Sequence, residues 1–278
     1  MANITAAEVN KLRQMTGAGM MDCKHALVES EGDFEKAIDY LRKKGQKVAA
    51  KRSDRDANEG IVIAKTNDNK TFAAIILLSC ETDFVAKNQE FIDFANALLN
   101  TSISQKPKTK EELLSLKFTE RTFAEGLSDL IGKTGEKMEL AHYQFIESPI
   151  TFSYNHQGNR LATIMGLNKA DVDGVDEIGH ELAMQIAAMA PVAVDKDDVE
   201  QHIIDKEIEI GKDLARQEGK PEEMVEKIAI GKLNRFFKDN TLLNQDFLRD
   251  NKLTVRQYLQ SHDKDLTVTS FKRHKLGE

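Results

Sequence analysis

Residue spacings in this sequence do not match those of the common phosphate, calcium or zinc sites. Gly132-Lys133-Thr134 resembles the end of a phosphate-binding loop, but the glycine required five positions earlier is Leu127. Asp171–Glu177 carries carboxylates that could bind calcium, yet Gly174 lies two positions too early for the loop and no glutamate closes it. The seven histidines are scattered, without the His-Glu-x-x-His or Cys-x-x-Cys spacing that holds zinc. We therefore predict a protein that is not an enzyme and needs no metal or cofactor.

Cys80 is a remaining candidate nucleophile, with His142 or His156 as its base. It follows the apolar run Ala73–Leu78, which is typical of a strand buried on both faces. A thiol at the end of such a strand is expected to be inert, because burial raises its pKa and the thiolate is the reactive form. Cys23 and Cys80 are the only cysteines, and their wide separation favours reduced thiols in a cytosolic protein over a disulfide framework.

The buried strand ends in a polar segment, Thr82–Val85, which we call the corner. Thr82 or Asp83 can cap the next helix by accepting hydrogen bonds from its first free backbone N–H groups. Phe84 lies in the first turn of that helix, where it is free to point away from the core. Alternatively, Phe84 packs onto its own helix as a hydrophobic staple, and spacing alone leaves both arrangements open.

Two segments of the chain resemble the signatures of one known family. Cys80–Ala86 is similar to the C-E/Q-T-D-F-V-A signature of bacterial elongation factor Ts. Leu12–Leu27 is similar to the other signature of that family, L-R-x-x-T-G-A-G-M/L-M-D-C-K-x-A-L. The two occur in the family's order, and weaker similarity extends along nearly the whole chain. The resemblance implies a guanine nucleotide exchange factor of elongation factor Tu, which makes and breaks no bond.

The same resemblance implies that the corner contacts the partner. In the family, this segment approaches the Mg2+ side of the nucleotide pocket of elongation factor Tu. The matching residues here are Thr82, Asp83, Phe84 and Val85. Phe84 would insert between partner side chains and displace the elements that position the ion, while Asp83 would support the corner or contact the partner near the metal. The partner would be bound in its GDP-loaded and nucleotide-free forms.

Further partner contacts are implied elsewhere in the chain. Arg13, Met20 and Met21 match residues that hold the same GTPase domain at a second place. From the residues alone, the methionines either fill the small core or, because adjacent side chains beside a glycine turn cannot both face inward, form a soft contact for a partner. His156 matches the family's Y-x-H hairpin, whose subdomain touches another domain of the partner. Ala162 stands where many relatives have glycine, which leaves the geometry of this hairpin open.

Composition limits the other partners. The 278 residues are 31% charged with a formal net charge of -7, which disfavours nucleic-acid binding because that relies on clustered Lys and Arg. The basic stretch Arg42–Arg52 has no interleaved aromatic residues and is expected to be a solvated helix end.

No apolar stretch approaches the roughly 20 residues of a membrane span, and the N-terminus lacks the pattern of an export signal. We expect a cytoplasmic protein that contacts no membrane, and a homodimer remains possible.

Periodicity predicts an α+β protein whose first part is helical. Residues 1–54 should form three helices, which we call the N-terminal module, with Thr5 and Glu8 as a capping box and the last helix ending at Gly45. This module resembles the ubiquitin-associated-like module that opens the family, and on its own it is also typical of a general helical binding module. Three helices of this size bury little surface, so we expect a marginally stable unit.

The rest of the chain should form a duplicated core of antiparallel sheets with helices. The first core subdomain, residues 55–147, is predicted to contain strands 59–66, 71–79 and 136–146 and helices 85–100, 110–116 and 119–132. The second, residues 148–278, is predicted to contain strands 152–154, 161–167 and 266–276 and the helix 175–190. Two apolar stripes joined by a short turn predict a projecting antiparallel helical hairpin at about 196–238.

Overall fold

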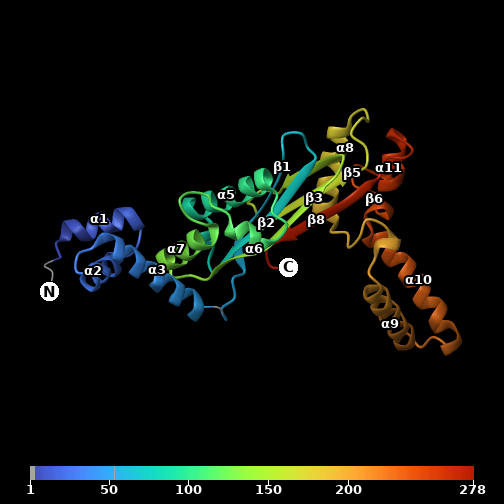
Figure 1. Ribbon diagram of the computed structural model, residues 1–278. Coiled ribbons are helices and arrows are strands. Elements are labelled where there is room, and N and C mark those ends of the chain that lie inside the picture. Colours follow the sequence, from blue (N-terminus) through green and yellow to red (C-terminus); the bar gives the residue numbers. More distant parts are fainter. Residues whose placement is uncertain (1–3, 53) are drawn as a thin grey trace. The chain divides into compact units, whose positions relative to one another are not determined.

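The computed structural model describes residues 4–52 and 54–278 and has the predicted α+β architecture (Figure 1). Two compact units make up the chain. The first contains the described residues up to Ile63, together with Ile76–Gln144 and Lys275–Glu278, and the second contains Ala64–Ile75 and Phe145–His274. The boundaries predicted near residues 54 and 147 do not divide the chain in this way, so they remain a prediction about subdomains.

The N-terminal module consists of α1 (Ala6–Thr16), α2 (Met20–Glu29) and α3 (Phe34–Lys51). Its small core is formed by apolar side chains at helical spacing: Val9, Leu12, Cys23, Ala26, Leu27 and Ala37. The capping box is confirmed, because Thr5 Oγ1 accepts a hydrogen bond from Glu8 N while the Glu8 carboxylate accepts one from Thr5 N. Gly17 ends α1 with a φ of 68°, a left-handed conformation that favours glycine.

Helix α3 does not end at Gly45, and that prediction was wrong: the helix continues to Lys51. Glycine near a helix end often marks its C-terminus. Here it serves a different purpose, because Gly45 lies against α7 (Phe123–Thr134). A Cβ atom at Gly45 would lie 2.8 Å from the backbone oxygen of Ser128. Close packing of two helices therefore accounts for this glycine.

The first sheet leads directly to the corner. Its strand order is β1-β2-β3, with β1 (Glu59–Thr66), β2 (Phe72–Cys80) and β3 (Met138–Glu147). Every residue of the central strand β2 is buried, as its apolar run predicted. After β2 the chain forms the single-turn helix α4 (Asp83–Ala86) and then α5 (Gln89–Gln105), α6 (Lys110–Ser115) and α7. The corner thus begins where a fully covered strand ends.

The second sheet repeats this arrangement. Its order is β4-β5-β8, with β4 (Ile150–Asn155), β5 (Leu161–Leu167) and β8 (Val268–Lys275). In both sheets the second strand of a hairpin occupies the centre, and a strand from much later in the chain pairs on its other side. Helix α8 (Val175–Met189) follows the second hairpin and packs its apolar face onto it. The shared strand order agrees with the predicted duplication.

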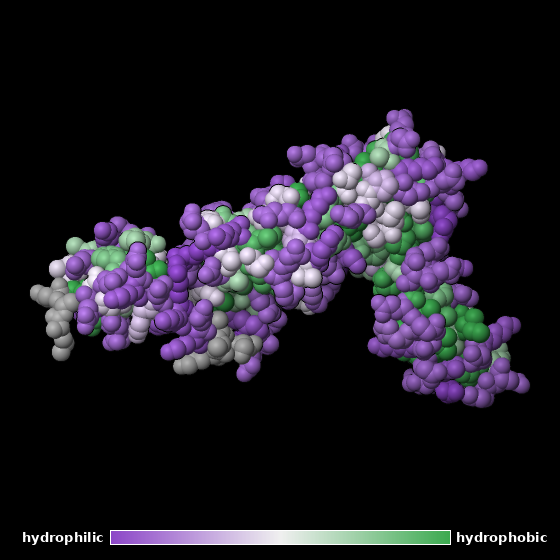
Figure 2. All heavy atoms as spheres, viewed as in Figure 1, coloured by the Kyte–Doolittle hydropathy of each residue, from purple (hydrophilic) through white to green (hydrophobic). Residues whose placement is uncertain are grey.

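The predicted helical hairpin is present as α9 (Gln201–Gln217) and α10 (Glu222–Asn240). The two helices approach closely where Gly211 meets Ala229, and a Cβ at Gly211 would lie 3.0 Å from Ala229 Cα. On the face seen in Figure 2, apolar residues gather along this hairpin. The exposed large apolar side chains of α9 and α10 are Ile210, Leu214, Met224 and Ile230.

Three short elements near the C-terminus were not predicted: β6 (Asp246–Phe247), β7 (Asp250–Thr254) and α11 (Val255–His262). Strands of this length are too short to show alternation of apolar and polar residues. Helix α11 is anchored by Val255 and Leu259 and by Tyr258, whose ring stacks on Phe247 at a centroid distance of 3.9 Å. These elements complete the core beneath the second sheet.

The contact between α8 and β4 provides a test of this packing. A Cβ atom at Gly179 would lie 2.2 Å from the ring of Phe152. Gly179→Ala should therefore lower the free energy of unfolding by about 1 to 3 kcal/mol, as overpacking of a core does. The matched control is Gly231→Ala in α10, where an added Cβ meets nothing within 4 Å, so this change should be neutral or stabilising. Urea denaturation measures both, and equal effects of the two variants would contradict the packing described.

Candidate partner-binding surface

The corner exposes its aromatic side chain. Thr82 is the N-cap of α4, and its Oγ1 accepts a hydrogen bond from Val85 N at 3.4 Å. Phe84 follows in the first turn with 81% of its surface exposed. The alternative that Phe84 packs onto its own helix is therefore excluded. Val85 is only 9% exposed, so within the corner it belongs to the core and presents no free side chain.

A carboxylate from a distant part of the chain, Glu136, holds Thr82. Glu136 accepts one hydrogen bond from Thr82 N at 3.1 Å and another from Thr82 Oγ1 at 2.7 Å, each on a different oxygen. Hydrogen bonds to a charged acceptor are stronger than neutral ones. Because both bonds attach to the residue that caps α4, the direction of this single turn is fixed by Glu136 as well as by the strand before it.

A second carboxylate, Glu81, anchors the residue just before the corner. It accepts hydrogen bonds from Lys137 N at 2.6 Å, from Arg52 Nη1 at 2.8 and 3.0 Å, and from Arg55 Nη1 at 3.1 Å. The backbone N–H of Lys137, with the two guanidinium groups, lowers the pKa of Glu81 to about 2. Glu81 therefore stays ionised at any pH near neutrality.

The role of Glu81 was not predicted, although the residue is part of the signature segment. One signal was present in the sequence: a carboxylate that follows a largely apolar strand lies near the core and needs partners. Its partners could not be identified, because Arg52 and Lys137 are far from it along the chain. The stretch that ends at Arg52 was interpreted as a solvated helix end, but Arg52 is bound to Glu81.

Cys80 does not have the environment of a nucleophile. Its side chain is fully buried and its Sγ donates a hydrogen bond to the Thr82 carbonyl oxygen at 3.2 Å. Burial, with the negative charge of Glu136 nearby, raises the pKa of Cys80 to about 12. The thiol therefore stays protonated and supports the corner from inside. Cys23 is also a buried free thiol.

Asp83 lies beside Phe84 and is paired with a cation. Lys87 Nζ donates a hydrogen bond to Asp83 Oδ2 at 2.6 Å, one helical turn further along the chain. This bond lowers the pKa of Asp83 below its ordinary value. The corner therefore presents a bare aromatic ring next to an ion pair, a combination that suits contact with a partner that has both apolar and charged groups.

A second exposed surface lies at the turn between α1 and α2. Met20 and Met21 begin α2 and are 56% and 71% exposed, so neither fills the core of the module. Arg13, in the last turn of α1, is exposed as well, and its carbonyl oxygen accepts the hydrogen bond from Gly17 N that closes the helix. The structure thus brings these three residues to the surface on the two sides of one short turn.

His156 lies in the second unit, at the loop between β4 and β5. Its Nδ1 is 2.9 Å from the hydroxyl oxygen of Tyr154, and its side chain is exposed. The two strands pair without interruption from Ile150↔Leu167 to Asn155↔Ala162, so alanine at 162 does not disturb the hairpin. The predicted hairpin is confirmed, while a role for His156 in partner binding stays a prediction.

Two features of the described part of the chain bear on other classes of function. Across residues 4–52 and 54–278, no group of three or more His, Cys, Asp or Glu side chains is arranged to hold a metal ion. No helix in these ranges has both the length and the apolar composition that crossing a membrane requires.

Comparison with known proteins relates this geometry to one family. The family model described as Elongation factor TS matches residues 81–278. Over 275 residues the chain is 52% identical to an elongation factor Ts of Porphyromonas gingivalis, covering 99% of this chain and 98% of the relative. Over 277 residues it is 53% identical to that of Christiangramia forsetii and 51% identical to that of Flavobacterium psychrophilum, covering 100% of each chain in both comparisons. The similarity therefore includes the N-terminal module.

The anchoring of Glu81 predicts a pH-dependent contribution to stability. A carboxyl group whose folded-state pKa is lowered stabilises the fold at high pH, and this contribution is lost as pH falls from about 4.5 to about 2. Glu81→Gln should therefore lower the free energy of unfolding by about 1 to 3 kcal/mol at neutral pH, and the difference should shrink on acidification. Denaturant unfolding at several pH values measures this.

The control for this prediction is Glu120→Gln, because Glu120 is an exposed carboxylate outside the corner. It should change the free energy of unfolding by less than about 0.5 kcal/mol at any pH. A Glu81→Gln variant as stable as the native protein at neutral pH would show that this carboxylate does not hold the corner. A loss in the free energy of unfolding that is undiminished near pH 2 would lead to the same conclusion.

Proposed function

The chain belongs to the elongation factor Ts family, and on that premise we propose that it is a guanine nucleotide exchange factor for elongation factor Tu. It binds the GTPase and promotes release of GDP during translation elongation, in the cytoplasm. The observation that carries the proposal is Phe84, a large aromatic side chain held in the solvent by a rigid corner. Exposed apolar residues of this kind are typical of a protein-binding site.

Exchange of this type needs binding energy and no catalytic group. A GTPase holds its nucleotide through phosphate contacts and a shared Mg2+, and its switch loops have more than one arrangement. A factor that binds the arrangement with a disturbed Mg2+ site more tightly must weaken the affinity for nucleotide by the same factor, because coupling between two ligands is reciprocal. The factor therefore binds both the GDP-loaded and the nucleotide-free partner, with preference for the second.

We assign the disturbance of the Mg2+/phosphate site to the corner. Phe84 inserts between partner side chains beside the ion and displaces the groups that position it. A ring on a mobile loop would lose its rotational and backbone freedom on docking, which weakens binding. Thr82 and Glu81 prevent this loss, since both are fixed by charge-assisted hydrogen bonds before the partner arrives. Asp83 is already neutralised by Lys87, so the docking surface brings no unpaired carboxylate to the interface.

The turn between α1 and α2 with Met20 and Met21, which we call the methionine turn, supplies a second contact on the GTPase domain. Met20 and Met21 are flexible and polarisable, and such side chains adapt to an irregular apolar surface. Arg13 provides a cation on the other side of the same turn. His156 provides a weaker contact to another domain of the partner. Contacts at more than one place increase the free energy that is available to shift the partner's conformation.

Replacement of Phe84 tests the proposal. Phe84→Ala should slow stimulated GDP release from elongation factor Tu by about ten- to a hundredfold, which is the usual effect of removing an aromatic anchor from an interface. Its free energy of unfolding should change by less than about 0.5 kcal/mol, because the ring is exposed. Stopped-flow fluorescence with labelled GDP measures the rate. Leu248→Ala removes another exposed apolar side chain and should leave the rate unchanged; native rates for both variants would refute the proposed role of the ring.

The methionine turn gives a separate prediction. The double variant Met20→Ala, Met21→Ala should weaken complex formation with elongation factor Tu by about tenfold while its melting temperature stays unchanged, because both side chains lie outside the core. Isothermal titration calorimetry and circular dichroism measure the two quantities. Met224→Ala, an exposed methionine on α10, is the control and should affect neither. A lower melting temperature with native affinity would assign the pair to the core of the module.

A further inference from the structure

Helix α3 crosses α7 at a contact that has room for no side chain. A Cβ atom on Gly45 would lie 2.8 Å from the Ser128 carbonyl oxygen and 3.3 Å from Gly132 Cα, and a Cβ on Gly132 would lie 3.2 Å from Gly45 Cα. Distances below about 3.0 Å force the backbone to move, because the neighbouring atom is main chain and has no alternative rotamer. The two helices therefore meet backbone to backbone. We call this contact the glycine seat.

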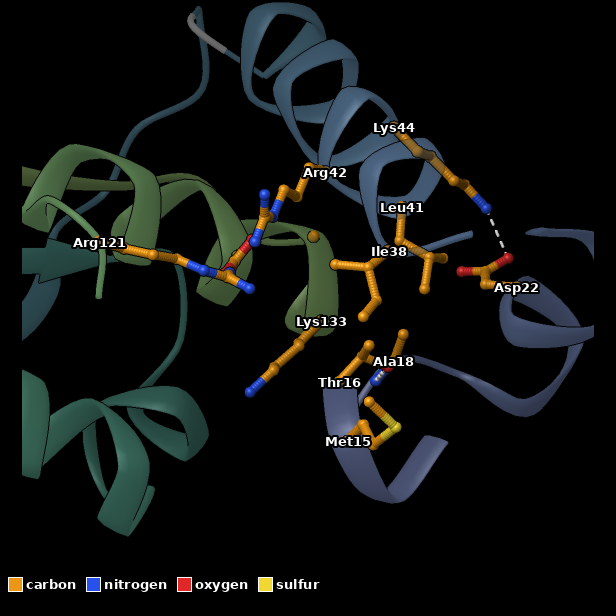
Figure 3. A pocket seen from close by; sticks show the side chains of 12 residues that line it. Met15, Thr16, Ala18, Asp22, Ile38, Leu41, Arg42, Lys44, Arg121 and Lys133 are labelled. Atoms are coloured by element: carbon orange, nitrogen blue, oxygen red, sulfur yellow. Dashed lines mark hydrogen bonds and ion pairs between the residues drawn. The ribbon is translucent and has the colours of Figure 1, made fainter. Parts of the chain in front are cut away.

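The glycine seat borders a cavity between the module and α7, because Gly132 is among the residues that line it. A cavity of about 250 Å3 lies between them and is lined by apolar and charged side chains. Figure 3 shows Ile38 and Leu41 of α3 pointing toward Met15 and Ala18, while Arg42 and Arg121 lie on the side of α7. Part of the interface between α3 and α7 is therefore a cavity that side chains line but do not fill. At the glycine seat, by contrast, the backbones of α3 and α7 are in direct contact.

The same helix connects the two partner-binding surfaces of the first unit. Helix α3 packs on α2, and the Nζ of Lys44, the residue directly before Gly45, forms an ion pair with Asp22, one residue after Met21. Directly after its last residue, Arg52 binds Glu81, one residue before Thr82. The methionine turn and the corner are therefore linked through α3, and the glycine seat lies between the two attachments.

We propose that Gly45 and Gly132 are positioning residues that set the separation between the methionine turn and Phe84, so that both contact one GTPase domain at the same time. The inference rests on the proposed function and adds a requirement to it. When two contacts are held at the spacing of their targets, the second forms as an intramolecular step at high effective concentration. When the spacing varies, the second contact forms less often and affinity falls, although each surface is intact.

The variant Gly45→Ala distinguishes the positioning role of Gly45 from an effect on the stability of α3. Alanine favours a helix more than glycine does, so α3 itself should become more stable in Gly45→Ala. The added Cβ would nevertheless push α3 away from α7 at Ser128. Gly132→Ala should act in the same direction with a smaller effect, because its closest contact is 3.2 Å. Gly231→Ala in α10 is the matched control, since its Cβ meets no atom within 4 Å.

The geometry can be measured without the partner. Nitroxide labels on Lys24→Cys in α2 and Glu111→Cys in α6 report the distance between the module and the core, since both residues are exposed. Cys23 and Cys80 are buried and should remain unlabelled. Pulsed electron paramagnetic resonance should give a narrow distance distribution for the native protein and for Gly231→Ala, and a shifted or broader one for Gly45→Ala. A native distribution for both Gly45→Ala and Gly132→Ala would overturn the proposal.

A changed spacing of the two contacts should raise the concentration that half-saturates stimulated GDP release, with little change in the maximal rate. For unlabelled Gly45→Ala, the concentration that half-saturates stimulated GDP release from elongation factor Tu should rise on the order of tenfold. The maximal rate should stay within about twofold of native, because the corner is intact. A shifted distance distribution with native half-saturation would refute the positioning role. If Phe84→Ala also leaves release unchanged, the proposed function itself fails, whereas the distance measurement still reports on the glycine seat.

Discussion

The structure depends on two half-buried carboxylates, Glu136, which holds Thr82, and Glu81, which anchors the residue before it. A helix of a single turn, such as α4, is not stable on its own. The free energy needed to nucleate a helix exceeds the stabilisation from the hydrogen bonds of one turn. An exposed phenyl ring adds no packing energy either. The direction of Phe84 is therefore set by charge-assisted hydrogen bonds that its neighbours make with distant parts of the chain. The buried strand β2 supplies the rigid support from which they act.

This arrangement suits a protein that works by binding. Thiol chemistry at Cys80 is excluded by burial and a high pKa, and the same thiol supports the corner through its hydrogen bond to Thr82. Free energy for exchange has to come from contacts that favour one conformation of a GTPase over another. Preorganised contacts are the most effective, because little of their free energy is spent on ordering the protein. The corner and the glycine seat are both preorganised in this sense, one by charge and one by backbone packing.

Local features of the fold followed from the sequence, and long-range features did not. The capping box at Thr5, the buried strand before Cys80 and the α9–α10 hairpin were predictable, because each depends on residues close together in the chain. The partners of Glu81 were not, since Arg52 and Lys137 come from other elements. Gly45 was misinterpreted as a helix end because the same residue type serves both helix termination and close packing of helices. Phe84 could be placed at the corner, but its exposure depended on neighbours that spacing does not reveal.

If Glu81 contributes to exchange by holding Phe84 in place, the two residues act on GDP release as one unit. A double-mutant cycle on stimulated GDP release from elongation factor Tu tests it most directly, with Glu81→Gln and Phe84→Ala made singly and together at a temperature where all variants are folded. We expect strong coupling: Glu81→Gln slows release when Phe84 is present and has almost no further effect when residue 84 is alanine. Independent effects that multiply in the double variant would contradict it.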